Sequence, residues 1–398
     1  MKYSVLSIGI IAAMDMAKLA LEGGKPASDK LIPIAKPMFS EKTIRDVSDV
    51  LRSGYIRQGP RTKEFEEKFK ERFGAKHAYA VSTGTAALHV AYLSILKPSD
   101  EVIVPSFTFL ATASMVFYSQ GRPVFADIDP GTFIMDPEDV KKKITSRTKA
   151  IVPVHLFGNA ANMSALGDIA EDHGIYLISD SAQAHGTEYN GKDLGSFDDL
   201  NCYSFYPSKS MTTGEGGMVT TNDDDLDRLG RLIRSHGDDG RYHHVMLGLN
   251  YRMTDIAAVI GLNQLTDFDS YLAERRKNGK YLRERIERID GLHPQKIEKG
   301  VNHSYSYFSL AMDMEQFRCS RDQFLEALSA ENVDCAVHYP IPLTKQPAIT
   351  NLIKPEECPI SEDVSNRIFS LPMHPELTEL DLEKIVEGTE KVATHFHV

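Results

Sequence analysis

Short apolar runs of β-forming residues alternate with helix-patterned stretches between residues 77 and 221. The runs typical of strands are 78–82, 101–105, 123–128, 150–154, 175–180, 201–205 and 217–221. Helical patterning is clear over 85–95 and 136–143. This alternation predicts an α/β fold, in which helices cover both faces of a mostly parallel sheet. Ligands of such sheets bind at the carboxyl ends of the strands, so we expect the functional site at that edge.

A chain of 398 residues is too long for one ordinary hydrophobic core, which favours two lobes. We predict a large lobe over residues 33–270 and a smaller α+β lobe over 271–398. A proline-free helical segment over 255–289 would link them. The small lobe is expected to contain a strand at 304–312 and helices at 321–331 and 381–394.

Residues 1–32 are expected to form an N-terminal extension. Its apolar stretch, residues 5–14, is too short to span a bilayer and runs directly into Asp15. The stretch faintly resembles the core of a signal peptide. A start codon assigned too early, with Met14 or Met16 as the true first residue, explains it at least as well, so we do not expect a secreted protein. The sequence therefore predicts a cytoplasmic protein without a membrane segment.

Charge and cysteine content exclude several classes of protein. The net charge of −11 disfavours a surface that binds the phosphate backbone of a nucleic acid, so we expect no nucleic-acid partner. The four cysteines are scattered, without the spacing of a zinc site or of a disulfide framework. We therefore expect no metal site and a reducing compartment.

The segment Ser204-Phe-Tyr-Pro-Ser-Lys209 is followed by the glycine-rich stretch 213–218. Most lysines are solvated surface charges, but glycines beside this one let the backbone approach a ligand closely. An amine that forms a Schiff base must lie near a carbonyl and be partly desolvated, so that its pKa falls. Lys209 is therefore the candidate catalytic lysine.

The apolar run 175–180 ends in the carboxylate of Asp180, and Gln183 follows three residues later. Asp180 alone would most simply be a helix N-cap. The alternative is a buried carboxylate that pairs with a pyridinium nitrogen and keeps it protonated, so that the ring accepts electrons. In that case Gln183 would reach the phenolic oxygen of the same ring.

Two further turns supply candidate binding residues. Residues 81–88 place Ser, Gly and Thr between a strand and a helix start, where free N–H groups and the helix dipole suit a phosphate ester. Phe107 and Phe109 follow the next strand, and one of them could stack on a flat cofactor, although both could equally be core residues.

The combination of these motifs resembles the DegT/DnrJ/StrS sugar aminotransferases, which are fold-type I pyridoxal-phosphate enzymes. The resemblance runs from about residue 33 to the C-terminus. Each motif is weak alone, and their joint occurrence in this order is specific. The segments that carry it are 53–60, 81–88, 154–158, 180–183, 204–209, 248–255, 338–340 and 371–375.

The resemblance implies a role for each matching residue. Lys209 would form the internal aldimine with pyridoxal 5′-phosphate and move the proton, and Asp180 would pair with the pyridine nitrogen. The remaining cofactor contacts would be Gly84, Thr85, Phe109, Gln183 and Ser204, with Asn250 from the partner of an obligate homodimer. Arg252, His338 and Tyr339 are implied as substrate contacts, although a structural salt bridge is nearly as good an interpretation of Arg252. Family members that carry histidine in place of the lysine deoxygenate sugars, and Lys209 argues against that reaction.

The reaction implied is a ping-pong transamination through pyridoxamine 5′-phosphate, with glutamate or glutamine as donor and a keto-sugar as acceptor. Two acceptors remain open. A nucleotide diphosphate needs clustered positive groups, for which Arg57, Arg234, Arg241 and Arg252 are candidates, and we rank a nucleotide-linked keto-hexose first. The leader 16–26 instead resembles that of cyclitol aminotransferases and favours a free keto-cyclitol. A non-catalytic regulator on the same fold is a third possibility, because fold alone does not fix function.

Overall fold

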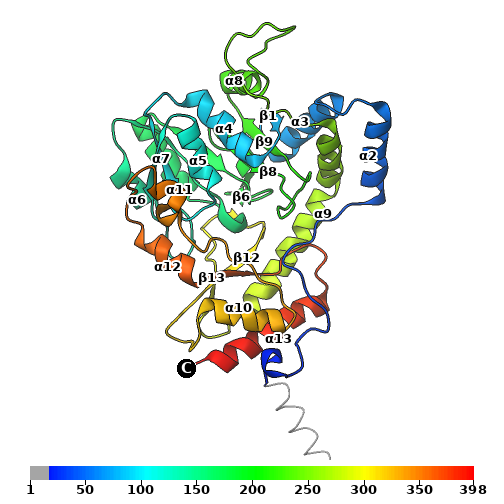
Figure 1. Cartoon of the computed structure of the whole chain (residues 1–398), viewed down its shortest axis with the longest axis vertical. Helices are drawn as coiled ribbons and strands as arrows, with labels where there is room; N and C mark the ends of the chain where they lie inside the picture. Colours follow the sequence, from blue (N-terminus) through cyan, green and yellow to red (C-terminus); the bar gives the residue numbers. More distant parts are fainter. Residues whose placement is uncertain (1–17) are drawn as a thin grey trace, which may run out of the picture.

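The computed structural model describes residues 18–398 (Figure 1). The apolar stretch 5–14 and both candidate start methionines lie outside this range. The chain folds around a seven-stranded sheet with the order β1-β9-β8-β5-β4-β2-β3. Within this sheet β9 alone runs antiparallel to its neighbours, so the predicted mostly parallel α/β sheet is confirmed. The strands are β1 His77–Val81, β2 Glu101–Pro105, β3 Arg122–Ala126, β4 Thr148–Ile151, β5 Tyr176–Asp180, β8 Leu200–Ser204 and β9 Gly217–Thr221.

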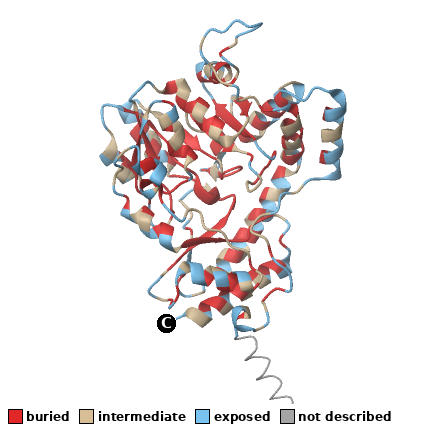
Figure 2. Ribbon diagram, viewed as in Figure 1, coloured by how far each residue is buried: buried red, intermediate tan, exposed pale blue. Residues whose placement is uncertain are grey.

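Successive residues of each strand enter different cores, because side chains alternate between the faces of a sheet. Val102 and Val104 pack in the core formed with α4 and α5, whereas Ile103 packs against α7 on the other face. Near β1, side chains of α3 and α9 pack on the sheet and form another core cluster with it. Buried residues accordingly fill the space between the sheet and its helices (Figure 2). The helices of this part are α2 Glu41–Ser53, α3 Pro60–Phe73, α4 Gly84–Ile95, α5 Ala111–Tyr118, α6 Pro137–Lys143, α7 Met163–His173, α8 Asp224–Arg234 and α9 Asp255–Ile286.

A second, three-stranded antiparallel sheet with the order β10-β12-β13 follows α9, which runs from one sheet to the other (Figure 1). The predicted lobe boundary at residue 270 falls inside this helix. The predicted strand 304–312 starts only at Phe308, because Tyr305 adopts a positive φ of 50° that breaks an extended run. The elements are β10 Leu292–Pro294, β12 Phe308–Met312, α10 Arg321–Ala330, α11 Pro347–Thr350, α12 Pro359–Arg367, β13 Ile368–Leu371 and α13 Glu379–Phe396. A small sheet joins β6 Glu188–Tyr189, β7 Lys192–Asp193 and β11 Val301–Asn302.

The described part of the N-terminal extension packs on this second sheet rather than on the large one. Glu331, which is completely buried, accepts hydrogen bonds from the backbone N–H groups of Ala20 and Ala27, both at 2.8 Å. Ile32 forms a parallel bridge with Val333. The first described residues therefore add a layer to the C-terminal part of the molecule.

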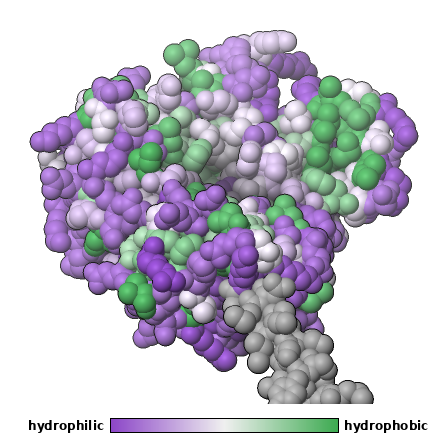
Figure 3. All heavy atoms as spheres, turned by 60° about the horizontal axis from the view of Figure 1, so that its bottom comes forward, coloured by the Kyte–Doolittle hydropathy of each residue, from purple (hydrophilic) through white to green (hydrophobic). Residues whose placement is uncertain are grey.

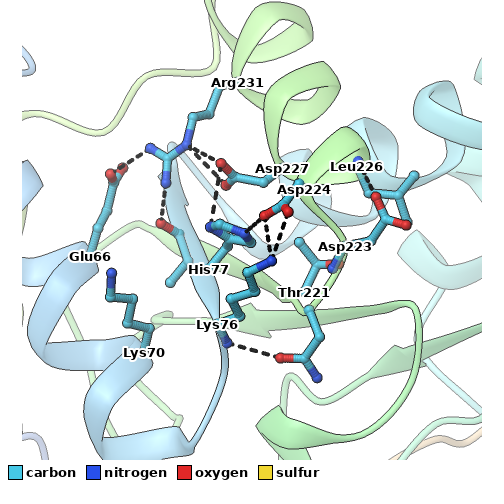
Figure 4. A network of polar contacts seen from close by, with 12 residues as sticks. Glu66, Lys70, Lys76, His77, Thr221, Asp223, Asp224, Leu226, Asp227 and Arg231 are labelled. Carbon is cyan, nitrogen blue, oxygen red and sulfur yellow. Dashed lines mark hydrogen bonds and ion pairs between the residues drawn. The ribbon is translucent and has the colours of Figure 1, made fainter.

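An ion-pair network holds α8 against α3 and the edge strand β1 (Figure 4). Arg231 contacts Glu66 at 2.8 Å, Asp227 at 2.9 Å and the carbonyl of Ala78 at 2.7 Å. Arg234 reaches the second oxygen of Glu66 at 2.6 Å. Because Glu66 and Arg234 are both buried, the pairs in this network are screened little by salt.

None of the helices among residues 18–398 combines the length and the apolar character that crossing a lipid bilayer requires.

Candidate active site

A cavity of about 530 Å³ opens at the carboxyl ends of β1, β2, β5 and β8, where the α/β architecture predicts the site. Most of the candidate residues line it together, although they are spread over 256 positions of the chain, from residue 84 to residue 339. They are Gly84, Thr85, Phe109, Asp180, Gln183, Ser204, Lys209, His338 and Tyr339.

Asp180 ends β5 with its carboxylate in this cavity, and only 5% of the residue is exposed. One oxygen accepts the hydroxyl of Thr112 at 2.8 Å, and the other accepts the N–H of Ala182 at 3.2 Å. Burial raises the pKa of Asp180, whereas these two donors and the charge of Lys209 oppose the rise. A cationic partner in the cavity would therefore stabilise the carboxylate form.

Lys209 lies in a tight turn after β8 that closes on the glycine-rich stretch. Phe205 exchanges backbone hydrogen bonds with both sides of that stretch, to Gly216 at 2.9 Å and from Thr213 at 3.0 Å. Desolvation lowers the pKa of Lys209 to about 8, against the opposing pull of Asp180. A lysine with this pKa is partly uncharged near neutral pH, which is the form that attacks a carbonyl.

The helix α4 begins at the cavity with backbone N–H groups that no other group takes. Thr83 caps the helix through its hydroxyl, which accepts the N–H of Ala86 at 3.0 Å. In the described chain the N–H groups of Gly84 and Thr85 have no protein acceptor. A Cβ at Gly84 would lie 2.6 Å from that of Ser204, so glycine is required for this close approach. The N–H groups of Gly84 and Thr85, together with the hydroxyl of Ser204, can therefore hold an anion at the start of this helix.

Gln183 is oriented by the backbone of the loop after β4. Its carbonyl oxygen accepts the N–H of Phe157 at 2.8 Å, so its amide nitrogen is the atom presented to the cavity. That nitrogen donates to the hydroxyl of Tyr339 at 3.1 Å. Gln183 can therefore donate to a ligand oxygen in the cavity.

The two phenylalanines after β2 have different surroundings. Phe107 is 1% exposed and belongs to a hydrophobic core, whereas Phe109 is 57% exposed and lines the cavity. The ring of Phe109 lies 6.1 Å from that of Tyr339, tilted by 39°. Phe109 is thus the ring available for stacking.

Several residues at the site carry no signal in the sequence. Thr112 is the buried donor to Asp180 but lies inside α5, where threonine is unremarkable. Cavity-lining residues of this kind include Thr108, Tyr206, Glu215 and Tyr307, which occupy positions that many chains fill with polar residues. Only their spatial proximity identifies them.

Asn250 and Arg252 do not line the cavity of their own chain. Asn250 is exposed and forms a backbone bridge with Ser235, while Arg252 is partly buried beside Val81. Arg57 and Arg241 are exposed. Arg234 as a phosphate-binding candidate is wrong, because it is buried and its guanidinium is held by Glu66 and by the carbonyl of Ala80 at 2.8 Å.

Residues 37–390 match the model of the DegT/DnrJ/EryC1/StrS aminotransferase family. The chain belongs to this family. The UDP-2-acetamido-2-deoxy-3-oxo-D-glucuronate aminotransferase of Pseudomonas aeruginosa is 37% identical over 349 residues, 87% of this chain and 95% of that protein. The GDP-perosamine synthase of Caulobacter vibrioides is 38% identical over 334 residues, 83% of this chain and 89% of that protein. DesI, solved in the presence of its TDP-sugar product, has a TM-score of 0.87 and 29% identity over 95% of this chain and 97% of that one.

Membership of the DegT/DnrJ/EryC1/StrS family confirms the resemblance seen in the sequence and identifies an enzyme, a pyridoxal-phosphate-dependent sugar aminotransferase. One relative, 35% identical over 359 residues, is named a pleiotropic regulatory protein of Geobacillus stearothermophilus, but the family and the relatives named as aminotransferases favour the enzyme over the regulator alternative. The cavity fits the cofactor that the family implies. It offers a lysine with a lowered pKa, a buried carboxylate for a cationic ring nitrogen, an amide donor, an exposed ring and an anion site at a helix start.

Proposed function

We propose that this aminotransferase moves an amino group from glutamate or glutamine to the keto group of a nucleotide-linked hexose. The observation that carries the proposal is that Lys209 and Asp180 line the same cavity. The lysine has a lowered pKa, and the carboxylate is buried, with its hydrogen bonds coming from two uncharged donors, Thr112 and Ala182.

When bound, pyridoxal phosphate supplies an electron sink for the substrate carbon that gains or loses a proton. Asp180 would hold the ring nitrogen protonated, because its two hydrogen-bond donors keep the buried carboxylate ionised. Gln183 would donate to the ring oxygen, and Phe109 would stack on the ring. The N–H groups of Gly84 and Thr85 and the hydroxyl of Ser204 would hold the phosphate.

Lys209 acts as the proton carrier. Its Nζ would move a proton from the donor carbon to the cofactor in the first half-reaction and from the cofactor to the acceptor carbon in the second. We expect ping-pong kinetics, because the keto product of the donor leaves before the acceptor binds. His338 and Tyr339 line the same cavity and would contact the sugar. The pKa of His338 falls to about 4 through burial and the charge of Lys209, so a neutral imidazole meets the substrate.

Relatives support the nucleotide-linked acceptor. Their names include a UDP-linked 3-oxo sugar aminotransferase and a GDP-perosamine synthase, and DesI was solved with a TDP-sugar product. Lys209 is the single lysine or arginine among the cavity-lining residues, so a diphosphate would lie outside the cavity. Arg57, Arg241 and Arg252 remain candidates for contacting it.

A homodimer with shared sites is part of the proposal. Asn250 is exposed in its own chain, as a residue that completes the phosphate site of a partner must be. An apolar patch is exposed near α2, on the right of the view in Figure 3, and would be covered by a second copy. Its residues are Phe39, Ile44, Leu51, Tyr55 and Ile56.

The experiment is a ligand-by-ligand comparison on the cofactor-loaded protein. UDP, GDP and dTDP are each tested for a rise in melting temperature, since a ligand that binds only the native state stabilises it. Scyllo-inosose is tested in parallel for amination with glutamate. We expect a shift with at least one nucleotide and no amination of the cyclitol. No shift with any nucleotide, together with amination of scyllo-inosose, would overturn the nucleotide-sugar assignment in favour of the cyclitol.

A further inference from the structure

A chain of buried polar side chains lies behind Asp180, outside the cavity. It consists of His155, Ser179 and Asp198. His155 and Ser179 are fully buried, Asp198 is half-buried, and none of the three lines the cavity. Ser179 immediately precedes Asp180 on β5, so the chain is attached directly to the strand that carries the carboxylate.

The hydrogen bonds of His155 give this chain a direction. The backbone N–H of Ala161 donates to Nδ1 of His155 at 3.1 Å, so Nδ1 carries no proton. The proton of the neutral ring is then on Nε2, which donates to the hydroxyl oxygen of Ser179 at 2.8 Å. Ser179 in turn donates its hydroxyl proton to Oδ2 of Asp198, whose pKa burial raises to about 8. Every polar atom of the imidazole is thus satisfied in one arrangement.

The loop that carries His155 contacts both Asp180 and Gln183. The backbone N–H of Asp180 donates to the carbonyl of Pro153 at 2.9 Å, and its backbone carbonyl accepts the N–H of His155 at 3.1 Å. Two residues after His155, the N–H of Phe157 holds the amide oxygen of Gln183 at 2.8 Å. One short loop therefore holds both the backbone of Asp180 and the side-chain amide of Gln183.

This loop does not hold its shape by local preference. Phe157 has a φ of 66°, a left-handed conformation that non-glycine residues rarely adopt. Such a conformation persists only when its surroundings impose it. The buried side chain of His155, fixed to β5 by Ser179 and to the far end of the loop by Ala161, is placed to impose it.

We propose that His155, through Ser179 and Asp198, is a positioning residue that fixes Asp180 and Gln183 at the spacing the cofactor ring requires. The proposal rests on the proposed roles of Asp180 and Gln183. It assigns His155 no contact with substrate or cofactor. Its effect reaches the reaction only through the two residues that the loop holds.

The test compares His155→Leu with a control, His374→Leu. His374 is also buried and lies between β13 and α13. It does not line the cavity, so it reproduces the loss of a buried imidazole away from the loop. Ser179→Ala is the milder variant, with Ser309→Ala, another buried strand serine, as its control.

Three quantities are measured: kcat and KM, the visible absorbance of the bound cofactor across pH, and cofactor retained after dialysis. We expect His155→Leu to lower kcat about tenfold to a hundredfold with little change in KM, as misplacement of catalytic groups does. The absorbance of the cofactor bound to this variant should change with pH around a different midpoint than in the wild type. The variant should also lose cofactor faster during dialysis. Ser179→Ala should change all three in the same direction by less. His155→Gln, whose amide can accept from Ala161 and donate to Ser179, should recover part of the loss.

Both controls should lower the melting temperature without changing the absorbance. If His155→Leu and Ser179→Ala keep the wild-type absorbance and kcat while Asp180→Asn is inactive, the positioning role is wrong and the proposed function stands. If Asp180→Asn is also fully active, the assignment of the site itself fails. If His155→Leu does not fold, Ser179→Ala alone decides whether the positioning role holds, by the same three measurements.

Discussion

The hydroxyl of Thr112 donates to Asp180 at 2.8 Å, and both residues are buried. Burial raises the pKa of Asp180 and this hydrogen bond opposes the rise, so Thr112 helps to keep the carboxylate ionised. Thr112→Val removes the donor with little change in shape. Since hydrogen bonds to charged groups are worth about 1.5–3 kcal/mol, we expect kcat to fall about tenfold to a hundredfold.

The pH profile distinguishes this cause from a packing defect. A higher pKa of Asp180 leaves less carboxylate at low pH, so the loss in Thr112→Val should be largest in acid and smaller as pH rises. Thr389→Val, which removes another buried hydroxyl in α13, is the control and should change stability only. A pH-independent loss in Thr112→Val would contradict the electrostatic role.

Lys209→Ala is expected to abolish transamination and to leave the fold intact. Borohydride reduction of the cofactor-loaded wild type should leave the cofactor attached to a peptide that contains Lys209, and mass spectrometry should find no attachment in the variant. Lys142→Ala, at an exposed lysine, is the control and should behave as wild type. Turnover of Lys209→Ala near the wild-type rate, without added amine, would show that another group performs the chemistry.

Loading of cofactor-free protein with pyridoxal phosphate should depend on pH through Lys209. Desolvation lowers its pKa from 10.5 to about 8. Only the uncharged amine attacks an aldehyde, so the rate should rise with pH and level off above that value. Stopped-flow absorbance gives the rate, and acylation of exposed Lys142 in the same sample is the reference. A profile for Lys209 that follows the reference lysine would contradict the lowered pKa.

Mixing two inactive variants tests the shared site. In a dimer of Lys209→Ala with Asn250→Ala, one of the two sites would combine an intact Lys209 with an intact Asn250 from the partner. Random exchange of subunits should then restore about a quarter of the wild-type activity, because half of the dimers are mixed and each has one intact site. No recovery after subunit exchange, verified by tagged subunits, would place both residues in the same chain's site or in none.

Arg234→Met is expected to destabilise the protein without altering nucleotide binding. It removes one of the two cations on buried Glu66, whose other oxygen keeps Arg231 at 2.8 Å. Breaking a buried pair costs about 3–5 kcal/mol, and the remaining partner should keep the loss near the lower end. Denaturant unfolding measures the change. A weaker nucleotide-induced shift at unchanged stability would restore Arg234 as a ligand-binding residue.

The order and type of the main elements follow from local patterns. The strands around the cavity are short apolar runs between turns, and they lie within two residues of their predicted ends. Lys209, Asp180 and the turn at Gly84 were recognisable because each lies at or shortly after the end of such a run, where a parallel sheet brings strand ends together. The small lobe was predicted less well, since the strand expected from residue 304 begins at Phe308.

Only the tertiary structure determines which residues distant in sequence become hydrogen-bond or ion-pair partners. Thr112 lies 68 positions from Asp180, and nothing near either residue marks the contact. The sequence does not distinguish Arg234 from an exposed arginine, but packing of α8 against β1 and α4 buries it beside Glu66. Hydrophobic periodicity and turn residues act over a few positions and therefore appear in the sequence. Burial, the pKa values that follow from it and the choice of hydrogen-bond partner depend on which segments pack together, which only the folded chain determines.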